Sequence, residues 1–592
     1  TGGATLDASG TGSGTMSFTG TGSLGFIGTT PEGGTASTST AARTLVLTGT
    51  NAGDNTFTPV IANNTGATSL TTSGTGTWVL NGSNTYTGGT TLTLGTLRAG
   101  KASAFGSGAL NLNGGSLTSD GATARAFANN VTVGGNITLG ATTTNTGVLT
   151  FNGTVGLGAA VRTLTVDSNV TFAGIISDGG LTKAGDGILT LSGINTFTLG
   201  TTITNGTITI GHASSLGAGT VNVASGATLN LASFNVSNTI TTVAGSTVTG
   251  GSLSAATAPT VGTVASVLTG TGATLTKTDG GRLTLTGANT YTGATTLSAG
   301  TIAVPGFGDG IAASPIGITD PDLPANLVIS SGAKLEFTGG TATSTTRSFT
   351  VGGTAGIVAG TGAGTLEFTS TSKLATTGTD PALTLTANNV GSNGFDGILA
   401  SGSNPLANLT IDGIGTWVIG GNANRFRSDI LIEAFAGATL GFESGSLGMG
   451  SGYSTSVIQI SHNAVLVWSG TNTDDISSRL RIPTGATAKM NLGSNNVEFA
   501  TAPKNATGAA ITNGTIQKSG AGTLKIATTV SSPGLNFDVP TGKLTINGTV
   551  GNVSLASGST LGGSGFVGAV TAASNSTIGP GNSPGTLTAS TL

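Results

Sequence analysis

Residues able to carry out acid–base or metal chemistry are few and widely spaced in this chain. The 592 residues include two histidines, His212 and His462, and no cysteine. Hydrolysis needs a nucleophile with its base, a convergent pair of acids or a metal cluster. Neither histidine stands at a known spacing from Ser or Asp, so we expect surface or turn roles for both. Without Cys, disulfides and thiolate metal sites are excluded.

Two close pairs of carboxylates are candidates for chemistry, Asp320 with Asp322 and Asp474 with Asp475. A pair of acids on one face can cleave polysaccharide, and Asp309 with the first pair could offer oxygens to calcium. The spacing fits no calcium-loop signature, and solvated loop positions are the simpler interpretation. We therefore predict no catalytic residue, no metal site and no cofactor, and a protein that is not an enzyme.

Charge gathers in one region, residues 425–481, which we interpret as a divergent part of a larger repeating body. Charged residues on an otherwise uncharged surface are candidates for self-association or partner contact. The residues predicted for this role are Arg425, Arg427, Asp429, Glu433, Asp474, Asp475, Arg479 and Arg481.

The overall composition excludes several classes of protein. Only 7% of residues are charged and the net charge is −3, so the basic surface that nucleic acid requires is missing. No stretch reaches the roughly 20 apolar residues of a membrane-spanning helix. With 36% hydrophobic residues, the chain is also unlike a disordered one. It starts at Thr1 without an apolar leader, as expected of a mature exported chain or of a segment cut from a longer protein.

One phrase recurs along the sequence. LTTSGTGTWVLNGSNTYTGGTTLTLGTLRAG at 70–100 returns as LTKAGDGILTLSGINTFTLGTTITNGTITIG at 181–211, and a third copy, LTKTDGGRLTLTGANTYTGATTLSAGTI, occupies 275–302. Such a period is typical of repeat architectures, in which each unit buries its apolar edge by stacking on its neighbours.

Within each copy, apolar residues alternate with others in a strand-like period of two. We expect one apolar pair to point inward in each copy and the residue between them to point outward. The inward pairs are Trp78 with Leu80, Leu189 with Leu191, and Leu283 with Leu285; the outward residues are Val79, Thr190 and Thr284.

Short strands of about four or five residues and Gly-rich turns favour a coil-upon-coil winding over a sandwich with matched hairpins. The predicted fold is all-β, a right-handed parallel β-helix (β-solenoid) forming a single elongated rod over 1–592. The Pro-rich segment 305–324 reads as a loop inserted between coils.

Each copy also places Asn two residues before an aromatic ring. We expect Asn84, Asn195 and Asn289 to stabilise a turn. The rings could form an exposed sugar-stacking stripe, but packing at the core edge is the favoured interpretation. The rings are Tyr86, Phe197 and Tyr291.

The phrases LTKAGDGILTLSGINTFTLGTT and LTKTDGGRLTLTGANTYTGATT resemble the autotransporter-associated β-strand repeat, also called the passenger-associated transport repeat, of Gram-negative bacterial surface proteins. The resemblance implies export to the cell surface or secretion, and a right-handed β-solenoid body. Family members commonly continue into an outer-membrane β-barrel. The printed sequence shows no such region, so the barrel was cleaved or excluded, or the route to the surface differs.

Three functions remain open on these grounds. The first is a non-enzymatic extracellular structural protein that self-associates into a surface fibre or layer, a homo-oligomer or filament joined through its terminal coils and the charged region. The second is a passenger adhesin that presents loops such as 305–324 to host or matrix glycans. The third is a polysaccharide-degrading β-helix enzyme that uses an acidic pair.

Overall fold

The computed structural model describes most of the chain. The described residues are 3–10, 14–24, 40–63, 65–254, 261–278, 280–310, 312–330, 332–360, 362–369, 372–399, 406–421, 424, 426–434, 437–447, 457–460, 463–581 and 585–592, with the backbone alone given for 252–254 and 426–434.

Short strands wind in successive coils and pair in parallel with the strands above and below, which confirms the all-β solenoid. Thr96–Ala99, for example, pairs in register with residues 77–80 of the preceding coil and 116–119 of the following one. Helical structure in the described residues is limited to one 3-10 turn, η2 (Pro324–Asn326). None of it is long and apolar enough to cross a membrane. The chain divides into two compact units, Thr1–Leu268 and Thr269–Leu592.

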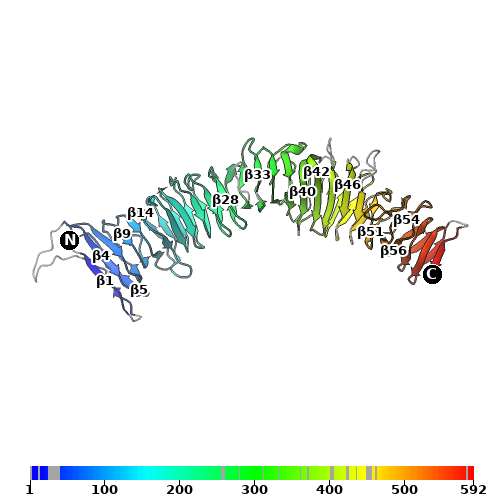
Figure 1. Ribbon diagram of the computed structural model, residues 1–592. Helices are drawn as coiled ribbons and strands as arrows, with labels where there is room; N and C mark the ends of the chain where they lie inside the picture. The colour runs from blue at the N-terminus through cyan, green and yellow to red at the C-terminus, as the bar shows by residue number, and fades with distance from the viewer. Residues whose placement is uncertain are drawn as a thin grey trace, which may run out of the picture. The chain divides into compact units, whose positions relative to one another are not determined.

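In the first unit, three parallel ladders carry the coils (Figure 1). One ladder consists of β1 (Ala4–Asp7), β4 (Arg43–Thr48), β7 (Thr68–Thr72), β9 (Thr90–Leu92), β11 (Leu110–Leu112), β14 (Val131–Val133), β17 (Val155–Gly156) and β20 (Ile176–Ser177). The next consists of β2 (Ser17–Phe18), β5 (Asp54–Phe57), β8 (Thr77–Leu80), β10 (Thr96–Ala99), β12 (Ser116–Ser119), β15 (Ile137–Leu139), β18 (Val161–Val166), β21 (Gly180–Ala184), β23 (Thr201–Ile203), β25 (Val221–Val223) and β28 (Ile240–Thr242). The third consists of β13 (Arg125–Phe127), β16 (Leu149–Phe151), β19 (Val170–Phe172), β22 (Ile188–Leu191), β24 (Thr207–Ile210), β26 (Thr228–Asn230), β29 (Thr247–Thr249) and β31 (Gly262–Val264). Shorter pairings join β3 (Ser23–Leu24) to β6 (Val60–Ile61), and β27 (Asn235–Val236) to β30 (Ser252–Ser254) and β32 (Val267–Thr269).

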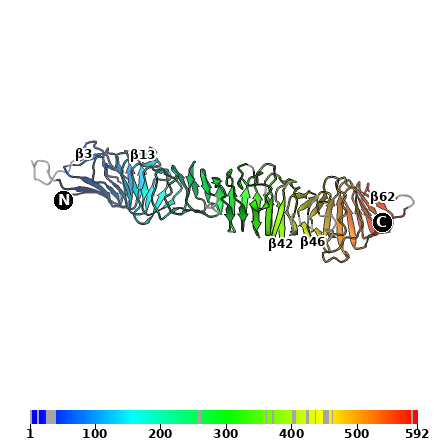
Figure 2. The same cartoon turned by 90° about the horizontal axis from the view of Figure 1, so that it is seen from above.

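The second unit repeats this plan (Figure 2). One sheet begins as two ladders, β33 (Leu275–Lys277), β35 (Thr295–Leu297) and β37 (Leu327–Ser330) in one and β34 (Arg282–Leu285), β36 (Thr301–Val304) and β38 (Lys334–Phe337) in the other. Both pair with β40 (Phe349–Ala359), and the sheet continues through β42 (Leu374–Ala387), β44 (Leu406–Gly413), β46 (Phe426–Ala434), β48 (Val457–Ile460) and β50 (Leu480–Arg481). A second holds β39 (Thr343–Thr345), β41 (Leu366–Phe368), β43 (Ser392–Phe395), β45 (Thr416–Ile419), β47 (Thr439–Phe442), β49 (Val465–Trp468), β51 (Thr487–Asn491), β53 (Gly514–Ser519), β56 (Leu535–Val539), β59 (Val553–Leu555), β61 (Phe566–Ala572), β58 (Thr549–Val550) and β55 (Ser531–Ser532), with β63 (Thr588–Thr591) on β61. A third holds β52 (Val497–Phe499), β54 (Thr523–Ile526), β57 (Lys543–Ile546), β60 (Thr560–Gly563) and β62 (Thr577–Pro580).

The core of each unit is a column of inward side chains stacked coil on coil. In the first unit Phe105, Phe127, Phe151 and Phe172 form a continuous aromatic stack, with ring centroids 4.8, 5.4 and 5.2 Å apart. Each ring is fully buried, and such pairs add to the burial of apolar area. The predicted inward pairs of all three copies are buried, so the alternation in the sequence located the interior correctly.

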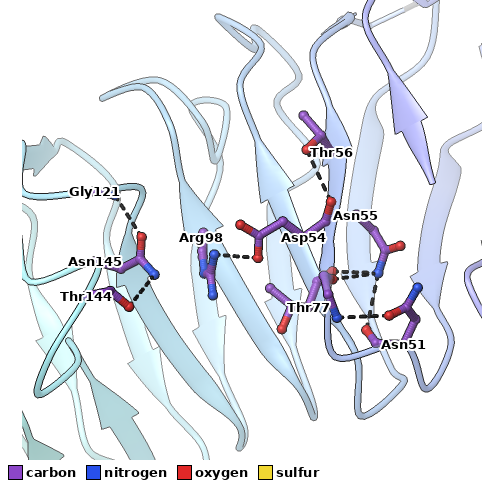
Figure 3. A network of polar contacts seen from close by, with 10 residues as sticks. Asn51, Asp54, Asn55, Thr56, Thr77, Arg98, Gly121, Thr144 and Asn145 are labelled. Carbon is purple, nitrogen blue, oxygen red and sulfur yellow. Dashed lines mark hydrogen bonds and ion pairs between the residues drawn. The ribbon is translucent and has the colours of Figure 1, made fainter. Parts of the chain in front are cut away.

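Val79 takes the outward position expected for it, like its counterparts in the other copies, but unlike them it is covered. Val79 is only 3% exposed, whereas Thr190 and Thr284 are half-buried. Val79 lies in register with Arg98 of the next coil, and Arg98 forms an ion pair with Asp54 of the preceding coil (Figure 3). The arginine therefore crosses β8, and its aliphatic stem covers the valine.

Strand lengths also differ from the expected four or five residues in part of the second unit. β40 and β42 are 11 and 14 residues long. Their pairing shifts register between Gly352 and Thr354, so these strands bend at an irregularity and continue where other coils turn.

Candidate ligand-binding site

A groove of about 490 Å³ opens on the second unit, and its lining is polar or glycine throughout. The lining residues are Asp396, Gly421, Glu443, Ser444, Ser469, Gly470, Thr471 and Asn472. We call this hollow the carboxylate groove.

The groove arises at the ends of four consecutive strands of one ladder. Phe395, Ile419, Phe442 and Trp468 are in register, so the residue that follows each of them occupies the same position in successive coils. Those following residues are Asp396, Gly420, Glu443 and Ser469.

Glycine in the second of these coils makes room for the Asp396 carboxylate. A Cβ at Gly420 would collide with Oδ1 of Asp396, so the Asp396 carboxylate leans over the Gly420 backbone. Glu443 lies one coil further. At about 4.8 Å per coil, the backbones that carry the two carboxylates are about 10 Å apart.

Buried amides and Asp474 hold the turns around the groove. Nδ2 of Asn424 donates to the carbonyls of Gly420 at 3.1 Å and Ser446 at 2.7 Å. Oδ1 of Asp474 accepts from the Ser444 hydroxyl at 2.9 Å, and Oδ2 accepts from the Gly445 amide at 2.7 Å. With these partners, Asp474 positions the groove wall and is already satisfied.

The other two carboxylates can receive a ligand. Among the described residues, no hydrogen-bond donor contacts the carboxylate of Asp396 or Glu443. Asp396 is half-buried, and this burial raises its pKa because the charged form loses water. Together with the hydroxyls of Ser469 and Thr471, these acceptors suit a ligand rich in hydroxyl groups. The described residues contain no group of three His, Asp or Glu placed to hold a metal ion.

The charged residues predicted as a contact surface make hydrogen bonds within turns, to a buried carbonyl or along their own strand. Asp475 caps turns, accepting from the amides of Ser477 and Ala500 at 2.9 Å each. Arg479 is 3% exposed and its Nη2 donates to the Leu447 carbonyl at 2.7 Å. Burial lowers the pKa of Arg479 to about 10. Nη1 of Arg481 donates to the Leu480 carbonyl of its own strand.

The remaining members of that predicted surface cannot be placed in the same way. Arg425 lies outside the described residues, and for Arg427, Asp429 and Glu433 only the β46 backbone is described. Among the described members, Asp474 is the one that contacts the groove wall.

The other sequence candidates lie in turns and loops. Asp320 and Asp322 are exposed, and Oδ1 of Asp320 accepts from the Asp322 amide at 3.0 Å. Nδ1 of His212 accepts from the Ser214 amide at 3.0 Å, a local turn contact. His462 lies outside the described residues.

The three aromatic rings of the repeat lie in the core, so the sugar-stripe alternative is wrong. Tyr86, Phe197 and Tyr291 are each 0% exposed. The asparagines act as staples between coils. Oδ1 of Asn195 accepts from the Ile176 amide at 2.7 Å, and its Nδ2 donates to the Ser215 carbonyl at 2.6 Å. Asn84 bridges Ile61 and Ala104 in the same way.

Asp396 and Glu443 were not predicted as site residues, because the predicted pairs of acids were neighbours in the chain. The sequence nevertheless contains a pattern that marks both. Each acid directly follows an aromatic residue that ends a strand, in GFD at 394–396 and GFE at 441–443. Stacking brings such equivalent positions together even when many residues separate them.

Comparison with known proteins agrees with this architecture. Residues 70–99, 181–210 and 275–304 match the passenger-associated-transport-repeat family. The chain is therefore a parallel β-solenoid in which three segments match the passenger-associated transport repeat.

A curated relative extends the similarity beyond the repeats. Over 319 residues, 52% of this chain, the sequence is 29% identical to the "Adhesin BmaC autotransporter" of Brucella suis biovar 1 (strain 1330). The aligned part is 9% of that protein, so the chain spans less than a tenth of its length. No solved structure matches the chain.

Proposed function

We propose that this chain is part of an extracellular, non-enzymatic passenger adhesin that binds hydroxyl-rich ligands, such as host or matrix glycans, in the carboxylate groove. The observation that carries the proposal is the groove itself, which Asp396 and Glu443 line from coils two steps apart. Acceptors without partners inside a concave polar site are suited to sugar hydroxyls.

Two findings support the adhesive role and the extracellular location. The repeats match a passenger-associated family, and the relative is named an adhesin autotransporter. The low charge of the surface also fits adhesion, because binding then depends on hydrogen bonds at one site and not on long-range attraction.

Glycan-array binding by the purified chain tests the proposal. We expect Asp396→Asn and Glu443→Gln each to weaken binding at least tenfold, since each replaces an acceptor oxygen by a donor. Glu498→Gln is the matched control, because Glu498 is an exposed acid on β52 outside the groove, paired with Lys525. Binding equal to that of the unmodified chain in both groove variants would exclude the groove as the ligand site.

Hydrolysis is the competing interpretation of the same two acids. The coils that carry the two acids are about 10 Å apart, and inverting glycosidases hold their two carboxyl groups roughly 6.5–9.5 Å apart. The raised pKa of Asp396 would also suit a general acid. Incubation with the glycans that bind on the array separates the two functions. Adhesion predicts that every bound glycan is recovered intact, whereas release of reducing sugar that disappears in Asp396→Asn would establish an enzyme.

Self-association into a fibre or layer, through the terminal coils and the region 425–481, remains a second proposal. Sedimentation velocity at rising concentration and physiological salt is the test. A monomer at every concentration contradicts self-association and leaves ligand binding untouched.

A further inference from the structure

The second repeat places a buried lysine where a turn gathers carbonyl oxygens. Lys183 is 0% exposed, and its Nζ donates to the carbonyls of Ala184 at 3.1 Å, Gly185 at 2.6 Å and Asn205 at 3.1 Å. Asn205 belongs to the following coil. One ammonium group therefore ties two consecutive coils together through backbone oxygens.

The same arrangement recurs at KSGAG near the other end of the chain. Nζ of Lys518 donates to the carbonyls of Gly520 at 2.6 Å, Gly522 at 2.5 Å and Thr541 at 3.1 Å. Lys518 is also 0% exposed. A cation among carbonyl oxygens is thus a regular part of this turn.

The first repeat has the turn but not the lysine. The family match aligns Thr72 with Lys183 and with Lys277, another fully buried lysine. Thr72 is 3% exposed, and its Oγ1 is buried without a hydrogen-bond partner. A buried hydroxyl without a partner is costly and calls for an explanation.

The carbonyl oxygens that surround the ammonium in the other copies are also present in the first. A Cβ built on Gly206 meets the Gly185 and Gly187 oxygens, and one built on Gly95 meets those of Gly74 and Gly76 in the same way. Gly185 has a positive φ and Gly74 does not. The two turns therefore place equivalent carbonyl oxygens at the same position with different backbone conformations.

In the first repeat no side-chain atom takes the place of the ammonium beside Gly95. On Gly206, the built Cβ lies 2.8 Å from Nζ of Lys183. On Gly95, the three nearest atoms are all backbone atoms within 3.1 Å, so no side-chain atom lies as near as the ammonium does in the second copy.

From this geometry we infer that the first repeat binds a monovalent alkali cation, K⁺ or Na⁺, where the other repeats place a lysine ammonium. The ligands are the carbonyl oxygens of Gly74, Gly76 and Leu94 together with Oγ1 of Thr72.

The charge of the ligand set selects the class of ion. All four ligands are neutral oxygens, and the position of Asp186, which faces Lys183 in the second repeat, is Thr75 in the first. Divalent cations in proteins usually take carboxylates, whereas rings of carbonyl oxygens replace the hydration shell of monovalent ions.

Amide hydrogen exchange in matched salts tests the site. In KCl or NaCl, we expect peptides covering 70–97 to be about tenfold better protected than in choline chloride at equal ionic strength. Peptides covering 181–208 carry their own ammonium and serve as the internal control, with equal protection in all three salts. Comparison of the KCl and NaCl arms then identifies the preferred ion.

Two variants complete the test. Thr72→Lys supplies the missing ammonium, so protection of 70–97 rises in choline chloride and no longer responds to K⁺ or Na⁺. Thr72→Val removes one ligand and should weaken ²⁰⁵Tl⁺ binding, followed by NMR, at least fivefold; it covers the case in which the lysine variant does not fold. Equal protection of 70–97 in all three salts, or an equal salt effect on 181–208, overturns the inference.

Discussion

Replacing Arg347 by Met should release the segment 305–323 from the second unit. Arg347 is 2% exposed and lies just before β40. Its guanidinium donates to the carbonyls of Phe307 at 2.9 Å, Gly308 at 3.2 Å and Gly317 at 2.6 Å, and to the hydroxyls of Thr319 at 2.6 Å and Ser314 at 3.1 Å. All five acceptors lie in residues 307–319, so this one side chain joins several parts of the loop, beside the backbone hydrogen bonds that the loop makes with Asn289 and Tyr291.

The size of the effect follows from what methionine leaves behind. A hydrogen bond from a charged donor contributes about 1.5–3 kcal/mol, but dehydration of the guanidinium, which lowers the pKa of Arg347 to about 10, offsets much of the total. Gly308 and Gly317 keep donors in the hydroxyls of Thr345 and Ser314. We expect a net loss of about 3 kcal/mol, which is roughly a hundredfold increase in local opening.

Hydrogen exchange of peptides covering 305–323 measures this opening directly. Arg282→Met is the matched control, because Arg282 forms an exposed ion pair with Glu336 that should contribute less than about 1 kcal/mol. The reasoning is refuted if protection of 305–323 changes less than threefold in Arg347→Met, or if protection falls equally across the second unit.

Three further predictions concern the stability of the coils. Burial lowers the pKa of Lys183 and Lys518 to about 8, so between pH 8 and 10 the unfolded chain binds more protons than the folded chain. The free energy of unfolding should therefore rise with pH in this range, and urea titrations measure the rise. Replacing both lysines by methionine should remove it. Asn195→Asp turns a donor toward the Ser215 carbonyl into a second acceptor, which should cost about 2–3 kcal/mol at pH 8 and less at pH 4, where the protonated acid can donate; an equal loss of thermal stability at both pH values would contradict this reading. Arg98→Ala uncovers Val79 and should cost about 1 kcal/mol in chemical denaturation, whereas Lys525→Ala, which breaks a more exposed ion pair, should cost less.

The repeating body was predictable from the sequence because its signals are local. Alternation around Leu189 and Leu283 identified strands and their inward faces, and this did not depend on what the next coil contained. Val79 shows where the rule stops. Its own strand correctly predicts an outward position, but an arginine from the next coil covers it, and the sequence of β8 does not report that neighbour.

The charged region 425–481 illustrates the same limit for function. Its density of charge marked it as a surface, yet Arg479 is buried against a backbone carbonyl and Asp474 and Asp475 hold turns. In a chain with so few charges, a buried charged group can serve as a structural clamp, and composition cannot distinguish that role from an exposed one.

The sequence by itself determined the parallel solenoid and the three copies of its repeat, because the period, the glycine turns and the inward residues are written within each copy. Only the tertiary structure decided which distant residues come together: Asp396 and Glu443 in the lining of one groove, Arg347 with the loop 307–319, and the carbonyls of Gly74 and Gly76 beside Gly95. The physical reason is that coils differ in length. The register between them is set by packing and hydrogen bonding along the stack, and no single stretch of sequence contains it.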